Sequence, residues 1–137
     1  MYIELVKMRN ALEILAQDQN LGLLARFPEG CCGCSSYLIA TYLEEKGWGK
    51  FDYIEGRKKR SINSHAWLLS ETGYVIDLTA DQFGFNKIIY TLEIEYPLLE
   101  LFPKQSNKGN ASILSGTKVN NSYHLAYQKI LDYVDGY

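Results

Sequence analysis

The sequence predicts an α+β fold, from helical periodicity near both ends and a β-hairpin pattern between them. Apolar residues recur at three- and four-residue steps in the first and last parts of the chain. Two runs of β-forming residues flank a turn cluster in the middle. We therefore expect N-terminal helices packed on an antiparallel sheet, with a closing C-terminal helix. The 137 residues suit a single domain covering 1–137.

Two helices are expected in the first third of the chain. Residues 3–18 carry apolar positions among charges at helical spacing, and residues 20–22 can end that helix. A turn at 27–30 leads into a second helix over 32–46, which Gly47 can stop. The face expected to be buried on the second helix comprises Leu38, Ile39, Tyr42 and Leu43.

The middle of the chain should form the sheet. Strands are expected over 51–55, 65–69, 74–79, 87–90 and 92–96. The second and third of these surround the turn cluster Ser70-Glu71-Thr72-Gly73, which predicts a β-hairpin. Residues 104–121 are polar and rich in Asn, Ser, Gly and Lys, so we expect a long loop there. Ser122 can then cap a last helix whose inward residues are Leu125, Ala126, Ile130 and Val134.

Charge and hydropathy narrow the class of protein. The formal charge of −2 favours neither nucleic acid nor an anionic membrane as a partner. The basic run 57–60 is interpreted as a solvated loop, with a docking patch for an acidic partner as the alternative. Charged residues interrupt 1–24, so no signal peptide is expected, and no stretch approaches the roughly 18 apolar residues of a membrane span. We therefore expect a soluble, cytoplasmic protein.

The three cysteines, Cys31, Cys32 and Cys34, are too close together to form a disulfide framework. The cysteines could instead bind a metal, take part in catalysis, or simply be buried. A structural zinc site normally needs ligand pairs at two places in the sequence, and there is one cysteine cluster here. A zinc site that includes His65 is therefore the less favoured alternative.

Cys32 stands where a reactive thiolate could be stabilised. It follows the turn at 27–30 and precedes an amphipathic helix, whose positive end favours the thiolate. Backbone N–H groups at that helix start, including that of Gly33, could bind a substrate oxygen. Spacing alone does not decide between Cys32 and its two cysteine neighbours.

The hairpin predicts a partner pair for this thiol. If 71–73 form a three-residue loop, Ser70 pairs with Tyr74 and His65 falls opposite Thr79. Asp77 then lies diagonal to His65 on the same face of the sheet, within reach of the imidazole. A one-residue change in the loop would place Asp77 on the other face. In this prediction His65 takes the proton of the thiol and Asp77 orients the imidazole.

Three stretches together carry a resemblance to a known superfamily. Residues 27–33 (FPEGCCG), 65–68 (HAWL) and 76–83 (IDLTADQF) resemble the papain-like and transglutaminase-like cysteine hydrolases in their Cys–His–Asp order. They are similar to small uncharacterised bacterial members and to glutamine-deamidase domains of bacterial toxins. The resemblance implies a papain-like α+β core, the catalytic triad Cys32, His65 and Asp77, no cofactor, and a peptide or protein substrate.

The chain also departs from that pattern. Papain-type peptidases carry an oxyanion glutamine about six residues before the nucleophile, where this chain has Arg26. Gln19 or Gln82 could substitute for it. Gly33, Trp67 and Gln82 are the candidate residues for substrate binding or the oxyanion hole. The arginine and two glycines that precede the cysteine in arylamine acyltransferases are also absent.

Alternative interpretations remain open at this stage. The cysteines could be inert thiols at a buried helix start, His65 a core histidine, and Asp77 a partner of the backbone. The preferred function is a thiol-dependent amide hydrolase acting on a peptide bond or a glutamine side chain. The alternatives are a non-enzymatic binding or immunity module on a degenerate papain-like fold, and a transglutaminase in which an amine replaces water.

Overall fold

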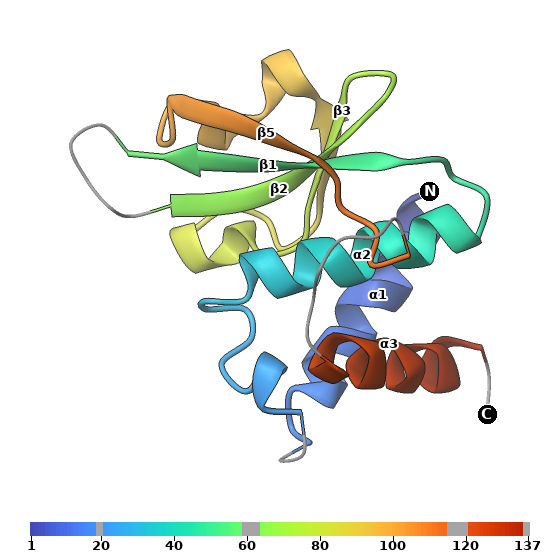
Figure 1. Cartoon of the computed structure of the whole chain (residues 1–137). Helices are drawn as coiled ribbons and strands as arrows, with labels where there is room; N and C mark the ends of the chain where they lie inside the picture. Colours follow the sequence, from blue (N-terminus) through green and yellow to red (C-terminus); the bar gives the residue numbers. More distant parts are fainter. Residues whose placement is uncertain (19–20, 59–63, 115–120, 136–137) are drawn as a thin grey trace.

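The computed structural model describes residues 1–18, 21–58, 64–114 and 121–135. In this part of the chain, three α-helices lie on one side of an antiparallel sheet of five strands (Figure 1). The α+β prediction is therefore confirmed, with the helices and the sheet in the expected order along the chain.

The helices are α1 (Tyr2–Leu15), α2 (Cys32–Glu45) and α3 (Asn121–Val134). Helix α1 ends three residues earlier than expected, and residues 19–20 lie outside the described part of the chain. The predicted face of α2 is confirmed, because Leu38, Ile39, Tyr42 and Leu43 are all buried. No helix among the described residues is long and apolar enough to cross a membrane.

Helix α3 buries a narrower stripe than its sequence predicts. Ala126 and Ile130 are fully buried and Val134 packs against the core, as expected. The prediction for Leu125 is wrong, because 48% of its surface is exposed. Tyr127 is buried instead, on the side of the stripe away from Leu125.

The sheet has the strand order β4-β3-β2-β1-β5. Its strands are β1 (Phe51–Arg57), β2 (Ser64–Ser70), β3 (Tyr74–Asp77), β4 (Ile89–Leu92) and β5 (Lys104–Asn110). The predicted hairpin is β2–β3, and β1 pairs with the other side of β2 (Figure 1). This arrangement puts the first residues of β2 and the last residues of β3 at one end of the sheet.

Two sequence predictions for the second half of the chain are wrong. A single strand, β4, replaces the two expected over 87–90 and 92–96, because the chain turns into a 3-10 helix at Glu93–Glu95 before Pro97. The first part of the expected loop 104–121 is strand β5, which pairs with β1 at the sheet edge. Most of its side chains are exposed, so it lacks the apolar alternation that identifies a half-buried strand.

Two hydrophobic cores lie on opposite faces of the sheet. The larger core packs α1, α2 and α3 against apolar residues of the strands, including Phe51 and Leu68. The smaller core covers the other face with Trp67 at its centre, among residues of the segments that follow β3 and β4. Side chains of β2 therefore alternate between two apolar environments, with no solvent-facing side over most of the strand.

A close backbone approach in the smaller core generates a first prediction. A Cβ atom on Gly56 would lie 2.5 Å from Trp67 and 2.8 Å from Phe102, so Gly56→Ala must displace fully buried rings. We expect a loss of about 1–3 kcal/mol in the free energy of unfolding, measured by urea denaturation. Gly22→Ala is the matched control, because nothing lies within 4 Å of its added methyl group. Equal stabilities of the two variants would contradict the packing around Trp67.

Candidate active site

The β2–β3 hairpin brings His65 and Asp77 into direct contact. Leu68 pairs with Ile76 and Leu69 with Val75, and the same register places His65 opposite Thr79. His65 Nε2 lies 2.7 Å from Asp77 Oδ2. The predicted diagonal pairing is thus confirmed, with the three-residue loop on which it depends.

The loop at 71–73 fixes this register. Gly73 has a positive φ of 86°, a conformation that glycine adopts without strain, and its N–H donates to the Ser70 carbonyl. The Ser70 hydroxyl accepts a hydrogen bond from the backbone N–H of Tyr74. These contacts close the turn, and a one-residue slip would carry Asp77 to the other face of the sheet.

The Asp77 carboxylate is held by more donors than His65 alone. The Tyr96 hydroxyl donates to Oδ2 at 2.6 Å, and the backbone N–H and hydroxyl of Thr79 donate to Oδ1 at 2.9 and 3.3 Å. Burial, followed by the charge of Asp77, raises the pKa of Tyr96 well above its ordinary value, so Tyr96 keeps its proton and donates. A buried carboxylate needs such partners, and these hold it in one orientation.

Tyr96 was not identified from the sequence as part of the site. It lies 19 residues after Asp77 and was assigned to a strand that does not form. The 3-10 turns around it, Glu93–Glu95 and Pro97–Leu99, direct its side chain into the smaller core. No pattern in the sequence indicates this placement, because it depends on how the chain turns after β4.

Aromatic rings enclose the imidazole. His65 is 1% exposed, and its ring centroid lies 4.9 Å from that of Phe83, 5.6 Å from Phe102 and 5.9 Å from Trp67. Trp67 is completely buried and packs beside His65. Trp67 thus lies in the core that covers the second face of the sheet, and its role toward a substrate stays a prediction.

The charge on His65 depends on Asp77 and Cys32. Burial opposes the imidazolium, but hydrogen bonding and the negative charges of Asp77 and Cys32 outweigh it and raise the pKa of His65 to about 9. With Nε2 bound to Asp77, Nδ1 is the nitrogen available to Cys32. No described residue meets hydrogen-bond geometry at Nδ1, although the Cys32 side chain is close enough to interact with the ring. The structure thus brings Cys32, His65 and Asp77 together.

Exposure distinguishes Cys32 from its two neighbours. Cys31 and Cys34 are 3% and 7% exposed, and both sulfur atoms lie 3.6 Å from the Leu23 carbonyl oxygen. The neighbouring Cys31 thiol and burial raise the pKa of Cys34 far above the ordinary value, so Cys34 stays a thiol. Cys32 is half-buried and begins α2. It is the accessible thiol of the three.

The remaining residues predicted for the site have different positions. Gly33, in the first turn of α2, lies against the Tyr53 hydroxyl. Gln82 Nε2 is buried and has no hydrogen-bond partner among the described residues. Arg26 is a surface residue 3.7 Å from Glu29, and Gln19 lies outside the described residues. Whether Gln19 or Gln82 replaces the glutamine of papain-type peptidases stays a prediction.

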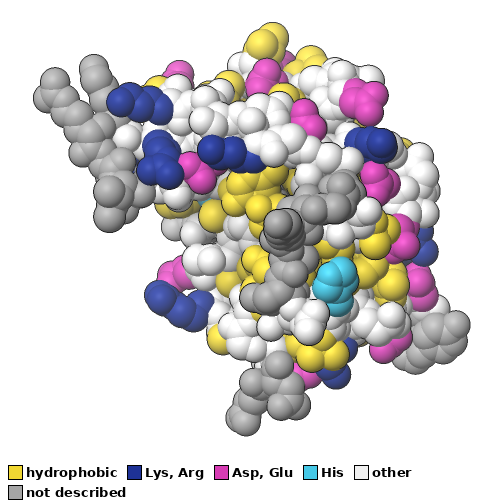
Figure 2. All heavy atoms as spheres, viewed as in Figure 1, with side chains coloured by type: hydrophobic (Ala, Val, Ile, Leu, Met, Phe, Trp, Pro, Cys, Tyr) yellow, Lys and Arg dark blue, Asp and Glu magenta, His cyan; other side chains and the backbone are white. Residues whose placement is uncertain are grey.

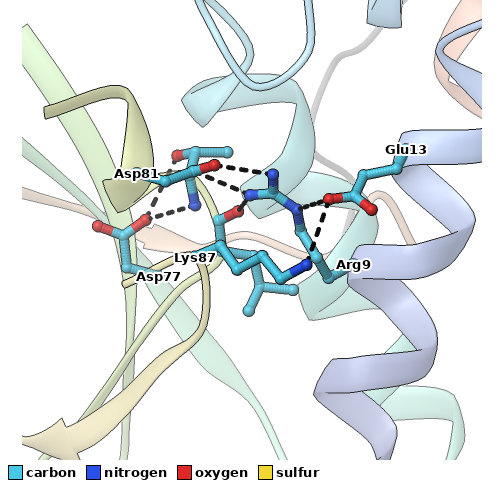
Figure 3. Close-up of polar contacts among 7 residues, drawn as sticks. Arg9, Glu13, Asp77, Asp81 and Lys87 are labelled. Carbon is cyan, nitrogen blue, oxygen red and sulfur yellow. Dashed lines mark hydrogen bonds and ion pairs between the residues drawn. The ribbon is translucent and has the colours of Figure 1, made fainter. Parts of the chain in front are cut away.

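Arg9, in helix α1, binds the turn that follows Asp77. Its guanidinium donates to the Leu78 carbonyl at 2.6 Å and to both Asp81 oxygens at 2.9 and 2.8 Å, while Nε binds Glu13 (Figure 3). The whole residue is 3% exposed. Because Leu78 and Asp81 lie on either side of Thr79, Arg9 stabilises the segment that holds the Asp77 carboxylate.

The same guanidinium also contacts the turn that precedes Cys32 in the sequence. Its carbon lies 4.7 Å from the ring centroid of Phe27, in the turn that precedes α2. Arg9 therefore contacts the segments next to two of the three candidate catalytic residues, Cys32 and Asp77. The sequence did not single out Arg9, because two of its partners, Leu78 and Asp81, lie 69 and 72 residues away.

Other candidate features lie outside this cluster. Arg57 binds Glu55, and the Lys58 amine lies over the Phe102 ring, while the rest of the basic run falls within 59–63, outside the described residues. No group of three or more His, Cys, Asp and Glu side chains in the described part of the chain is arranged to hold a metal ion. A groove of about 510 Å³ runs along 94–101, where Tyr96 contributes to its lining.

Comparison with known proteins identifies no relative. No family model matches the chain, and neither the curated proteins nor the solved structures include a significant match. The interpretation of this site therefore rests on its geometry and chemistry.

The raised pKa of His65 predicts how stability depends on pH. The folded chain binds the His65 proton with a pKa of about 9, against 6.5 for an ordinary histidine. This contribution to the free energy of unfolding is complete below pH 6.5 and is lost as the pH rises through 9. Urea denaturation under reducing conditions should show this loss in the wild type and a smaller one in His65→Gln. If the free energy of unfolding changed with pH in the same way in both proteins, the raised pKa of His65 would be contradicted.

The buried position of Arg9 predicts a large effect on stability. Arg9→Met leaves the Leu78 carbonyl without its donor and Asp81 without its cation, so we expect a loss of about 2–4 kcal/mol in the free energy of unfolding. Lys7→Met is the control, since its pair with Glu4 is on the surface and should contribute under about 1 kcal/mol. Similar losses in both variants, measured by urea denaturation, would contradict the buried network.

Proposed function

We propose that this protein is a cysteine hydrolase that cleaves an amide through Cys32, His65 and Asp77. The observation that carries the proposal is the buried His65, bound through Nε2 to Asp77, with Nδ1 left for the half-buried Cys32. A thiol needs an adjacent base, and that base needs a third group to orient it. All three are present, and the orienting carboxylate is itself fixed by Tyr96 and Thr79.

The proposed reaction begins with transfer of the Cys32 proton to His65 Nδ1. Asp77 accepts a hydrogen bond from Nε2 and stabilises the resulting imidazolium. The sulfur attacks the carbonyl carbon, forming an S–C bond and a negatively charged oxygen. As the intermediate collapses, the C–N bond breaks and His65 gives its proton to the departing nitrogen. An acyl-enzyme and a free amine, or ammonia, result.

The second half of the reaction releases the acyl group. His65 removes a proton from water, the hydroxide attacks the thioester, and the S–C bond breaks. The proton returns to Cys32, and the product is a carboxylic acid. A peptide bond and a glutamine side chain both fit this chemistry, the leaving group being an amine in one and ammonia in the other. If an amine enters in place of water, the same acyl-enzyme yields transamidation.

We also propose a papain-like arrangement for the core of the fold. Three features support it: the nucleophile begins a helix packed on an antiparallel sheet, the histidine lies near the start of β2, and the carboxylate ends the adjacent strand β3. The order Cys–His–Asp along the chain is the one found in that superfamily. The helix also directs its positive end toward the sulfur.

Thiol alkylation tests the proposed pair directly. We expect iodoacetamide to label Cys32 at pH 6 at least about tenfold faster in the wild type than in His65→Ala, because the imidazolium stabilises the thiolate. Mass spectrometry of peptides after timed labelling separates the three cysteines. Cys31 and Cys34 serve as internal controls, since both are buried.

A control variant separates loss of the base from loss of the fold. His124→Ala removes the other histidine, which lies in α3, and should leave Cys32 labelling unchanged. Circular dichroism and the urea midpoint check that His65→Ala remains folded. Slow labelling of Cys32 that is the same in the wild type and His65→Ala would overturn the hydrolase and favour a binding module on the same fold.

A further inference from the structure

Tyr53 lies against the first turn of the helix that carries Cys32. It extends from β1 on the face of the sheet that packs against α2. A Cβ atom built on Gly33 would lie 3.0 Å from the Tyr53 hydroxyl oxygen. The hydroxyl thus sits over the backbone of the residue that follows the nucleophile, and glycine at position 33 leaves it room.

The ring of Tyr53 is held in place by other tyrosines. It stacks on Tyr37 of α2 with ring centroids 4.9 Å apart and planes 20° from parallel. Tyr123 of α3 packs edge-on against Tyr37. Apolar side chains reach the surface between the strands and α2 in this region (Figure 2). A stacked ring has little freedom, so the position of its hydroxyl is well defined.

The Tyr53 hydroxyl is available as a donor. No hydrogen bond joins it to another residue in the described part of the chain. Burial, together with the neighbouring charges of Tyr37 and Cys32, raises the pKa of Tyr53 above its ordinary value. The hydroxyl therefore keeps its proton throughout the neutral pH range. Its contact with Gly33 places it one residue along the helix from Cys32.

We propose that the Tyr53 hydroxyl donates a hydrogen bond to the carbonyl oxygen of the group that Cys32 attacks. The proposal rests on the function proposed above. When the S–C bond forms, the carbonyl oxygen gains the electron pair of the C=O bond and needs donors nearby. Backbone N–H groups of the first turn of α2 have no acceptor within the helix and can supply others. Tyr53 would thus take the place of the glutamine that is absent before Cys32.

The experiment compares two reactions of the same sulfur. Acylation by 4-nitrophenyl acetate forms an S–C bond, generates charge on the carbonyl oxygen and releases 4-nitrophenolate. Alkylation by iodoacetamide displaces iodide and places no charge on a carbonyl oxygen. We expect Tyr53→Phe to slow acylation of Cys32 about 10²–10³-fold, the usual cost of one such donor, and to change alkylation less than about twofold.

Two further variants sharpen the test. Tyr123→Phe removes a hydroxyl from the outer ring of the same tyrosine group and should leave both rates unchanged. Gly33→Ala is favourable to a helix but places a methyl group 3.0 Å from the Tyr53 hydroxyl, so it should slow acylation selectively, by less than Tyr53→Phe does. Each variant is checked for an unchanged urea midpoint.

The outcomes separate this inference from the function on which it rests. Unchanged acylation in Tyr53→Phe, with alkylation of Cys32 still dependent on His65, overturns the role of Tyr53 and leaves the hydrolase standing. An equal fall in both rates overturns it as well, since Tyr53 would then act on the thiolate. A wild type that 4-nitrophenyl acetate does not acylate above the Cys32→Ser background also overturns it. If alkylation of Cys32 does not depend on His65, the proposed hydrolase function is itself overturned.

Discussion

The buried guanidinium of Arg9 is the interaction on which the arrangement of the site depends. It binds the segment that follows β3 through Leu78 and Asp81, and its face packs on Phe27 ahead of α2. One side chain from the first helix thus connects the segment that follows Asp77 with the turn that precedes Cys32. A cation this deeply buried is stabilised by several charged and dipolar partners acting together, so the three segments are positioned jointly.

Local sequence was sufficient to predict the contact between His65 and Asp77. Both residues belong to one hairpin, and the three-residue loop determines their register without reference to the rest of the chain. The buried face of α2 was predictable for the same reason, because helical periodicity is a local property. Where one element or one turn determines a contact, the sequence pattern was sufficient to predict it.

The residues that support the His65–Asp77 pair could not be predicted from the local sequence. Arg9 and Tyr96 reach Asp77 or its turn from segments remote in sequence, and each looks like an ordinary helix or strand residue in its own neighbourhood. The edge strand β5 was read as a loop because pairing on one side imposes no apolar pattern on exposed side chains. For Trp67 the sequence left core packing and a cleft wall open, because nothing in β2 indicates that both faces of the sheet are covered.

The division of the three side chains between layers has a consequence for the newly made chain. His65 and Asp77 can meet as soon as their hairpin closes, whereas Cys32 reaches them only after α2 has docked on the sheet. A chain that is still incomplete, or that has loosened its helical layer, would hold the base and its carboxylate but not the sulfur beside them. The three side chains would then come together only in the fully folded molecule, in which the helical layer covers the sheet.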